Sequence, residues 1–169
     1  MIHISRDIIQ YIGDYLDFES QINLQKTIQF SLTNMYTTNK LSIKITDDIL
    51  KKNIYLKKLN LYYNTQVTDI RFLKNLTTLN IGGKCKINID RINCSKIKTL
   101  NISNNININD LGRFAVLENL IMDGICGIEI EEIIKLKNLK YISVVDNPIK
   151  KKLMEIENKN INIQYFYIF

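Results

Sequence analysis

The stretch that decides the fold is residues 56–61, Leu56-Lys57-Lys58-Leu59-Asn60-Leu61, because its pattern returns four more times. The pattern is an apolar residue, two residues, an apolar residue, one residue and a third apolar residue. Further copies begin 20 to 22 residues apart, at Leu76, Ile97, Leu117 and Leu139. A fixed period in this range is the signature of a stacked-repeat protein, in which each copy buries its apolar face against the next.

Two features also repeat after each copy. Asparagine follows the last apolar residue by three residues in three copies, at Asn64, Asn105 and Asn147. In the other two copies Cys85 and Cys126 follow by four residues, which predicts turns that are one residue longer. Six residues after the last apolar residue, four copies have another apolar residue, at Val67, Ile87, Ile108 and Ile128.

Residues 56 to about 149 therefore resemble the leucine-rich repeat family. The resemblance implies that the asparagine, or cysteine, is buried and satisfies backbone groups of the turn, which would be costly to leave without partners. Asp69-Ile70 and Asp110-Leu111 precede the next strand and resemble the bacterial internalin type of repeat. The expected fold is an α/β solenoid: a leucine-rich-repeat horseshoe or right-handed superhelix, with a parallel sheet on the concave face and a short N-terminal helical segment.

Period-2 alternation predicts one short strand per copy, with Leu59, Leu61 and their counterparts pointing inward. The alternate residues would face outward on the concave side in three columns. These are Lys58, Thr78, Thr99, Asn119 and Tyr141; then Asn60, Asn80, Asn101, Ile121 and Ser143; then Tyr62, Gly82, Ser103, Asp123 and Val145. The candidate binding residues are Lys58, Asn60, Tyr62, Thr78, Asn80, Thr99, Asn101, Asn119, Ile121, Asp123, Tyr141 and Ser143.

Among these candidates, Tyr62, Ile121 and Tyr141 are the expected anchors, because buried aromatic residues dominate binding energy. The alternative is that Tyr62 and Tyr63 shield the end of the stack. The segments between strands are too short for long helices, so we expect turns and extended pieces there. Residues 129–136 are the exception and predict a helical turn or two.

The two ends of the chain depart from the repeat, so we divide it into residues 1–45, an N-terminal helical motif or cap; 46–149, about five repeats; and 150–169, a C-terminal cap. Apolar spacing predicts helices over residues 6–16 and 20–28. Residues 41–45 alternate like a strand and are expected to form the first, atypical rung of the stack. The C-terminal cap would contain a helix over 151–158 and a final strand over 161–169.

The N-terminal pattern resembles an F-box, a motif of about three helices that precedes leucine-rich repeats in many proteins. The matching positions are Ile4, Asp7, Ile8, Ile9, Ile12, Tyr15, Leu16, Phe18, Ser20, Leu24, Leu32 and Tyr36. The resemblance implies docking on a Skp-type adaptor of a cullin ubiquitin ligase, with Ile4, Ile8, Ile9, Ile12 and Leu16 as docking residues. The alternative is that the same residues cap the first repeat.

Composition restricts the function further. The net charge is +6, but the lysines are scattered and no aromatic residues share a face with them, so we do not expect nucleic-acid binding. No apolar run is long enough to span a membrane, and the N-terminus lacks a signal-peptide pattern. Three cysteines without C-x-x-C spacing favour a reducing compartment and no metal. We therefore expect an intracellular protein of the cytoplasm or nucleus.

A single histidine, His3, and the lack of a nucleophile–base constellation indicate that the protein is not an enzyme and has no cofactor. The function expected is protein–protein interaction, as the substrate-recognition subunit of a Skp–cullin ubiquitin ligase. The alternative is a free-standing leucine-rich-repeat binding protein whose N-terminal helices act only as a cap.

Overall fold

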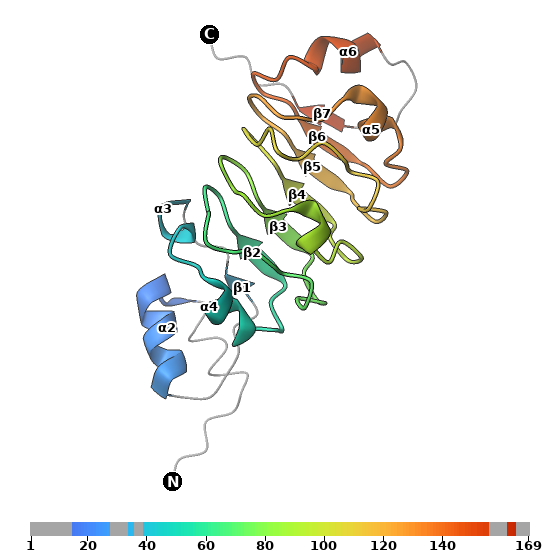
Figure 1. Cartoon of the computed structure of the whole chain (residues 1–169). Helices are drawn as coiled ribbons and strands as arrows, with labels where there is room; N and C mark the ends of the chain where they lie inside the picture. Colours follow the sequence, from blue (N-terminus) through green and yellow to red (C-terminus); the bar gives the residue numbers. More distant parts are fainter. Residues whose placement is uncertain (1–14, 28–33, 36–38, 156–161, 165–169) are drawn as a thin grey trace.

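A single parallel sheet of seven short strands forms a stripe along the molecule (Figure 1). The computed structural model describes residues 15–27, 34–35, 39–155 and 162–164. Each strand pairs only with its neighbours in sequence, which is the topology of a solenoid. The strands are β1 (Asn34–Met35), β2 (Lys58–Asn60), β3 (Thr78–Asn80), β4 (Thr99–Asn101), β5 (Asn119–Ile121), β6 (Tyr141–Ser143) and β7 (Asn162–Gln164). The expected parallel-sheet solenoid is confirmed.

The strand register stacks the repeated apolar residues on one another. Leu59 aligns with Leu79, and the column continues through Leu100, Leu120 and Ile142, all fully buried. A second buried column, two residues later, holds Leu61, Ile81, Ile102, Met122 and Val144. These side chains form the centre of one continuous apolar core, because each rung covers the face that the previous rung leaves open.

The segments that connect the strands contain only brief helical pieces. Among them are α4 (Asp47–Lys51), the 3-10 turn η1 (Ile89–Arg91) and α5 (Ile130–Ile134). Helix α5 lies inside the predicted helical stretch 129–136, where Ile130 and Ile133 face the core. Ile70 and Ile92 add an isolated parallel bridge on this side of the molecule.

The turn after each strand is built alike. The second residue beyond the last apolar position has a positive φ in every repeat, at Tyr63, Gly83, Asn104, Gly124 and Asp146. Asn105 Nδ2 then donates to the carbonyl of Ile81, and Asn147 Nδ2 donates to that of Met122. In a turn one residue longer, Cys126 Sγ lies 3.3 Å from the equivalent carbonyl of Ile102. These contacts confirm the expected role of the asparagine and of its cysteine replacement.

The N-terminal segment contains one of the two helices expected from the sequence. Helix α2 (Phe18–Thr27) covers the helix predicted over 20–28, and Asp17 caps it by accepting from the N–H of Ser20 at 2.9 Å. Ile22 and Leu24 of this helix pack against the core. Most of the helix predicted over 6–16 lies outside the described residues.

The strand predicted over residues 41–45 is wrong. Residues Asn39–Ser42 form helix α3, and a turn follows in which the N–H of Ile45 donates to the carbonyl of Ser42 at 3.1 Å. A strand would place Leu41, Ile43 and Ile45 on one face, but Ile45 is fully buried while Ile43 is 46% exposed. The first rung is instead β1, which pairs with β2.

The C-terminal segment continues the stack. Helix α6 (Lys150–Glu155) occupies the start of the helix predicted over 151–158, with Leu153 buried. Strand β7, within the strand predicted over 161–169, pairs in parallel with β6. Residues 156–161 and 165–169 lie outside the described part of the chain.

Candidate functional site: the outward face of the sheet

The outward face of the strands carries the binding residues predicted from the sequence. The register aligns them as expected, from Lys58 through Thr78 and Thr99 to Asn119 and Tyr141. Lys58 is exposed and the other four are half-buried. Asn119 Nδ2 donates to Thr99 Oγ1 at 3.2 Å, so a side-chain hydrogen bond also connects β4 and β5 in this column.

The second column is less accessible than the sequence suggested. Asn60, Asn80 and Ser143 are only 2%, 4% and 6% exposed, whereas Asn101 and Ile121 are half-buried. Each asparagine of this column accepts from the backbone N–H two residues later, at 2.9–3.0 Å; the donors are Tyr62, Gly82 and Ser103. These side chains therefore hold the ends of β2, β3 and β4, and the asparagine two residues before the turn in these three repeats was the available signal for that role.

The third column is dominated by Tyr62. Its ring lies over Gly82 of the next rung and packs edge-to-face on Tyr63, with the ring centroids 4.6 Å apart. Burial raises the pKa of Tyr62, so its phenol stays protonated at neutral pH. Tyr62 is half-buried and Tyr63 is 46% exposed, so Tyr62 covers part of the stack and also presents a surface.

At the other end of this column, Asp123 is held by neighbouring residues. Its Oδ1 accepts from Ser143 Oγ at 2.6 Å and from the N–H of Val145 at 2.9 Å. Lys58 and Asp123 are the charged side chains among the fifteen residues of the three columns. The face is therefore largely neutral and rich in hydroxyl and amide groups.

A row of charges borders this face just before the strands. Glu118 lies between Lys98 and Lys140 of the adjacent rungs, with 2.8 Å between its oxygens and each Nζ. Hydrogen bonds from Lys140 and Lys98 lower the pKa of Glu118 to about 2. The three side chains thus form a charged ladder across β4, β5 and β6.

The predicted adaptor-docking residues Ile4, Ile8, Ile9 and Ile12 lie outside the described residues. Leu16 is half-buried and lies two residues before the start of helix α2, and the neighbouring Tyr15 is 75% exposed.

The three cysteine side chains are free thiols; Cys85 and Cys94 are buried and Cys126 is partly buried. Burial raises the pKa of Cys85 and of Cys94 to about 11 and also raises that of Cys126, so the three thiols are protonated at neutral pH. Within residues 15–27, 34–35, 39–155 and 162–164, no group of three or more His, Cys, Asp or Glu side chains could hold a metal ion. Over those same residues, no helix is long and apolar enough to cross a membrane.

The strand register and the repeated turns define the molecule as a leucine-rich-repeat solenoid. Its structure is similar to the crystal structure of an internalin C2 from Listeria monocytogenes, with a TM-score of 0.56 and 19% sequence identity. The match covers 96% of this chain and 84% of that chain. At this identity the likeness is one of fold, and it agrees with the internalin-type Asp69-Ile70 and Asp110-Leu111 steps. No protein-family model and no curated protein sequence matches the chain.

Proposed function

We propose that the protein is an interaction module that binds another protein through the outward face of its parallel sheet. The observation that carries this proposal is the unbroken column from Lys58 to Tyr141, which places half-exposed hydroxyl, amide and phenol groups in register on five successive strands. A rigid, pre-ordered surface of this kind loses little conformational entropy on binding. Its neutrality suits a partner that offers hydrogen bonds and apolar contacts rather than a strong charge.

Among the candidate residues of this face, the accessible positions are the first column together with Asn101, Ile121, Tyr62 and Asp123. Asn60, Asn80 and Ser143 of the second column are almost fully buried, so they offer little surface to a partner. Tyr141 and Tyr62 lie near opposite ends of the columns, so they would contact a partner at both ends, with the small residues Thr78 and Thr99 between them.

A charge placed in the middle of the face tests the proposal. Thr99→Arg should abolish capture of the partner, because a bulky cation would separate the two surfaces, and it should leave the melting temperature nearly unchanged. Asn109→Arg, at an exposed position outside the strands, adds the same charge and serves as the matched control. Proteins captured from a lysate by the unaltered chain and by Asn109→Arg, but not by Thr99→Arg, are identified by mass spectrometry. Equal capture by all three chains would contradict the proposal.

The F-box resemblance supports a second, finer candidate: an adaptor role in which residues 1–45 dock on a Skp-type protein while the sheet face selects a substrate. The exposed ring of Tyr15, beside Leu16, favours this candidate. The packing of Ile22 and Leu24 against the core favours the alternative, in which the N-terminal helices are only a cap.

The two alternatives differ in the effect of Ile8→Asp combined with Ile12→Asp. An adaptor role predicts loss of co-purification with a Skp-type protein from a chain that stays folded by circular dichroism. A cap predicts unfolding of the first repeats, seen as a lower melting temperature.

A further inference from the structure

The strands of the solenoid begin along one edge, where the chain enters each of them from a tight turn. In five repeats this turn closes in the same way, because the N–H group of the first apolar residue donates to the carbonyl three residues earlier, at 3.1–3.4 Å. Five equivalent segments therefore lead from the turn into β2–β6. They are residues 54–58, 74–78, 95–99, 115–119 and 137–141, and we refer to them together as the entry edge.

The entry edge carries the whole net charge of the chain. Its five segments contain seven lysines, no arginine, no aspartate and one glutamate, which gives a formal charge of +6. The rest of the chain contains sixteen basic and sixteen acidic side chains, so it is neutral as a set. The lysines are scattered along the sequence because successive copies of the repeat begin 20 to 22 residues apart, and the fold brings them to one edge.

Hydrogen bonds place the segments that enter β2, β3 and β4 directly beside one another. The N–H groups of Thr77 and Thr78 donate to the carbonyl of Lys57, at 2.8 and 3.0 Å. Those of Lys98 and Thr99 donate to the carbonyl of Thr77, at 2.9 and 3.0 Å. Because rungs repeat about every 4.8 Å, these three rungs span about 10 Å.

Five of the seven lysines lie on these three rungs. We refer to them as the basic cluster: Lys57, Lys58, Lys74, Lys96 and Lys98. All five are exposed. Within the part of the chain that the structure describes, Lys98 pairs with Glu118, whereas the other four have no carboxylate partner. Lys96 Nζ donates to Asn75 Oδ1 at 3.4 Å, a neutral group that leaves its charge in place.

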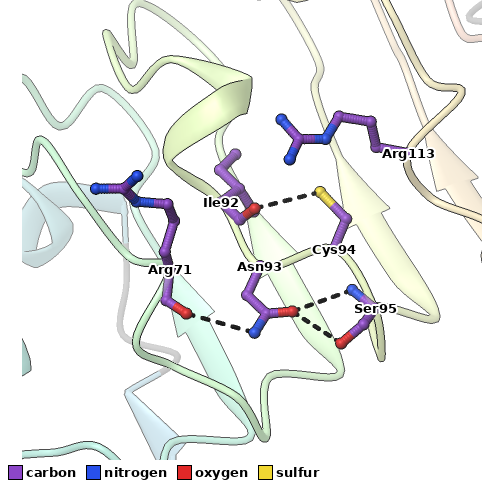
Figure 2. A pocket seen from close by; sticks show the side chains of 6 residues that line it. All are labelled: Arg71, Ile92, Asn93, Cys94, Ser95 and Arg113. Atoms are coloured by element: carbon purple, nitrogen blue, oxygen red, sulfur yellow. Dashed lines mark hydrogen bonds between the residues drawn. The ribbon is translucent and has the colours of Figure 1, made fainter.

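The turn that carries Lys96 is fixed against the preceding rung (Figure 2). Asn93 Oδ1 accepts from Ser95 Oγ at 2.8 Å and from the N–H of Ser95 at 3.2 Å. Asn93 Nδ2 donates to the carbonyl of Arg71 at 3.4 Å. The backbone that presents Lys96 is therefore ordered before any partner binds.

The arginines near the 3-10 turn η1 differ from the lysines of the basic cluster, because carboxylates offset them. Arg71 and Arg91 both pair with Asp69. Arg113 Nη1 lies 2.6 Å from Asp90 Oδ1. Exposed pairs of this kind add little to stability, but each places a negative charge beside the positive one. An anionic partner therefore finds unpaired cations at the entry edge rather than beside these arginines.

The basic cluster is compact, which favours a short acidic segment over an extended polyanion. The next segment, residues 115–119, contains no lysine, and its Glu118 pairs with Lys98 at 2.8 Å. The length of about 10 Å corresponds to roughly three residues of an extended chain. A single-stranded nucleic acid would also need aromatic side chains on which its bases stack. Tyr55 is the one aromatic residue in the segments that enter β2, β3 and β4.

We propose that the basic cluster binds a short acidic segment of a protein partner, in which several aspartate or glutamate side chains lie close together. Lysine ammonium groups are point charges on flexible stems, so they can follow a run of carboxylates that has no fixed geometry. The choice of a protein rests on the proposed function, because Lys58 belongs both to the cluster and to the first column of the sheet face. Complementary charge beside that face would guide the partner onto it.

The test is a titration of the full chain with a short labelled peptide in which glutamate alternates with serine, followed by fluorescence anisotropy. We expect saturable binding that weakens as the salt concentration rises from about 0.05 M to about 0.3 M, because salt screens exposed charges. The same peptide with glutamine in place of glutamate should not bind.

A triple variant locates the binding site. Lys57→Gln with Lys74→Gln and Lys96→Gln should weaken peptide binding by about tenfold or more. The matched control removes the same charge from exposed lysines outside the entry edge, and it should change the affinity by less than about twofold. It combines Lys84→Gln, Lys86→Gln and Lys151→Gln. Both variants should keep the melting temperature of the unaltered chain, since each loses only exposed side chains.

A single-stranded oligothymidylate and phosphatidylserine vesicles, compared at equal concentrations of anionic groups, represent the other classes of partner. Tighter binding of the peptide than of either supports the proposal. Equal or tighter binding of the oligonucleotide or the vesicles, no saturable peptide binding, or equal losses in the two triple variants would overturn it. Peptide binding without a partner that Thr99→Arg releases would contradict only the proposed function, and the reverse result would contradict only the acidic-segment proposal.

Discussion

The ring of Tyr62 determines which residue can occupy the next position of the third column. A Cβ atom on Gly82 would lie 2.7 Å from Cε2 of Tyr62 and 2.8 Å from the carbonyl oxygen of Ser103. The second of these atoms belongs to the backbone of the adjacent rung and cannot move aside easily. Glycine is therefore required at this position by close approach, since Gly82 does not have a positive φ.

Gly82→Ala should lower the free energy of unfolding by about 1–3 kcal/mol, the usual cost of overpacking. Gly112→Ala is the matched control, because a Cβ there would meet only Asp110 Oδ1, at 3.2 Å, and Gly112 is exposed. We expect the control to change stability by less than about 0.5 kcal/mol, measured by urea denaturation. Equal losses of stability for the two substitutions would show that the contacts with Tyr62 and Ser103 are not the cause of the loss.

Between neighbouring strands, the charged ladder across β4, β5 and β6 adds an electrostatic link to the backbone pairing. The backbone of Glu118 donates to the carbonyl of Lys98 and accepts from the N–H of Lys140, so the side chains are held at adjacent rungs. Glu118 is 24% exposed in its side chain, whereas the two lysines are more than half exposed.

This arrangement makes part of the stability depend on pH. The pKa of Glu118 falls from the ordinary 4.5 to about 2 on folding, so its contribution is present above pH 4.5 and is lost as the pH falls toward 2. Thermal denaturation should therefore show Glu118→Gln less stable than the unaltered chain near pH 6, with the difference shrinking between pH 4.5 and 2. Salt at about 1 M should reduce the difference at pH 6, because it screens exposed charges. A difference that is independent of pH would rule out the ladder as its cause.

Residues 41–45 show how a sequence pattern alone can predict the wrong element. The alternation of residues 41–45 predicted a strand, but Ser42 Oγ donates to the carbonyl of Tyr62, and Asn64 Nδ2 donates to the carbonyls of Ser42 and Ile45. These contacts join segments about twenty residues apart and favour a turn at residues 41–45. The first rung of the stack is therefore formed by β1. Alternation in an isolated five-residue segment carries no information about such partners.

Across the whole molecule, stability is distributed along a stack in which each rung contacts only its neighbours. Central rungs are covered on both sides, so Leu100 is fully buried between Leu79 and Leu120. Leu153, on α6 near the C-terminal end, is 6% exposed. Loss of a central side chain should therefore affect the whole domain more than loss of a terminal one.

Leu100→Ala should lower the free energy of unfolding by about 3 kcal/mol and raise amide hydrogen exchange throughout β2–β6, because a cavity in the central rung interrupts the stack. Leu153→Ala should raise exchange mainly in α6 and cost less stability overall. Both effects can be measured by hydrogen exchange with mass spectrometry. Equal global destabilisation by the two substitutions would argue against nearest-neighbour stacking.

The amino-acid sequence by itself determined the solenoid, the positions of β2 to β6 and the buried turn residues Asn64, Asn105 and Asn147, because these follow from a period that every rung repeats. Only the tertiary structure decided which outward residues stay accessible, since the burial of Asn60 and Asn80 depends on the backbone of the following turn.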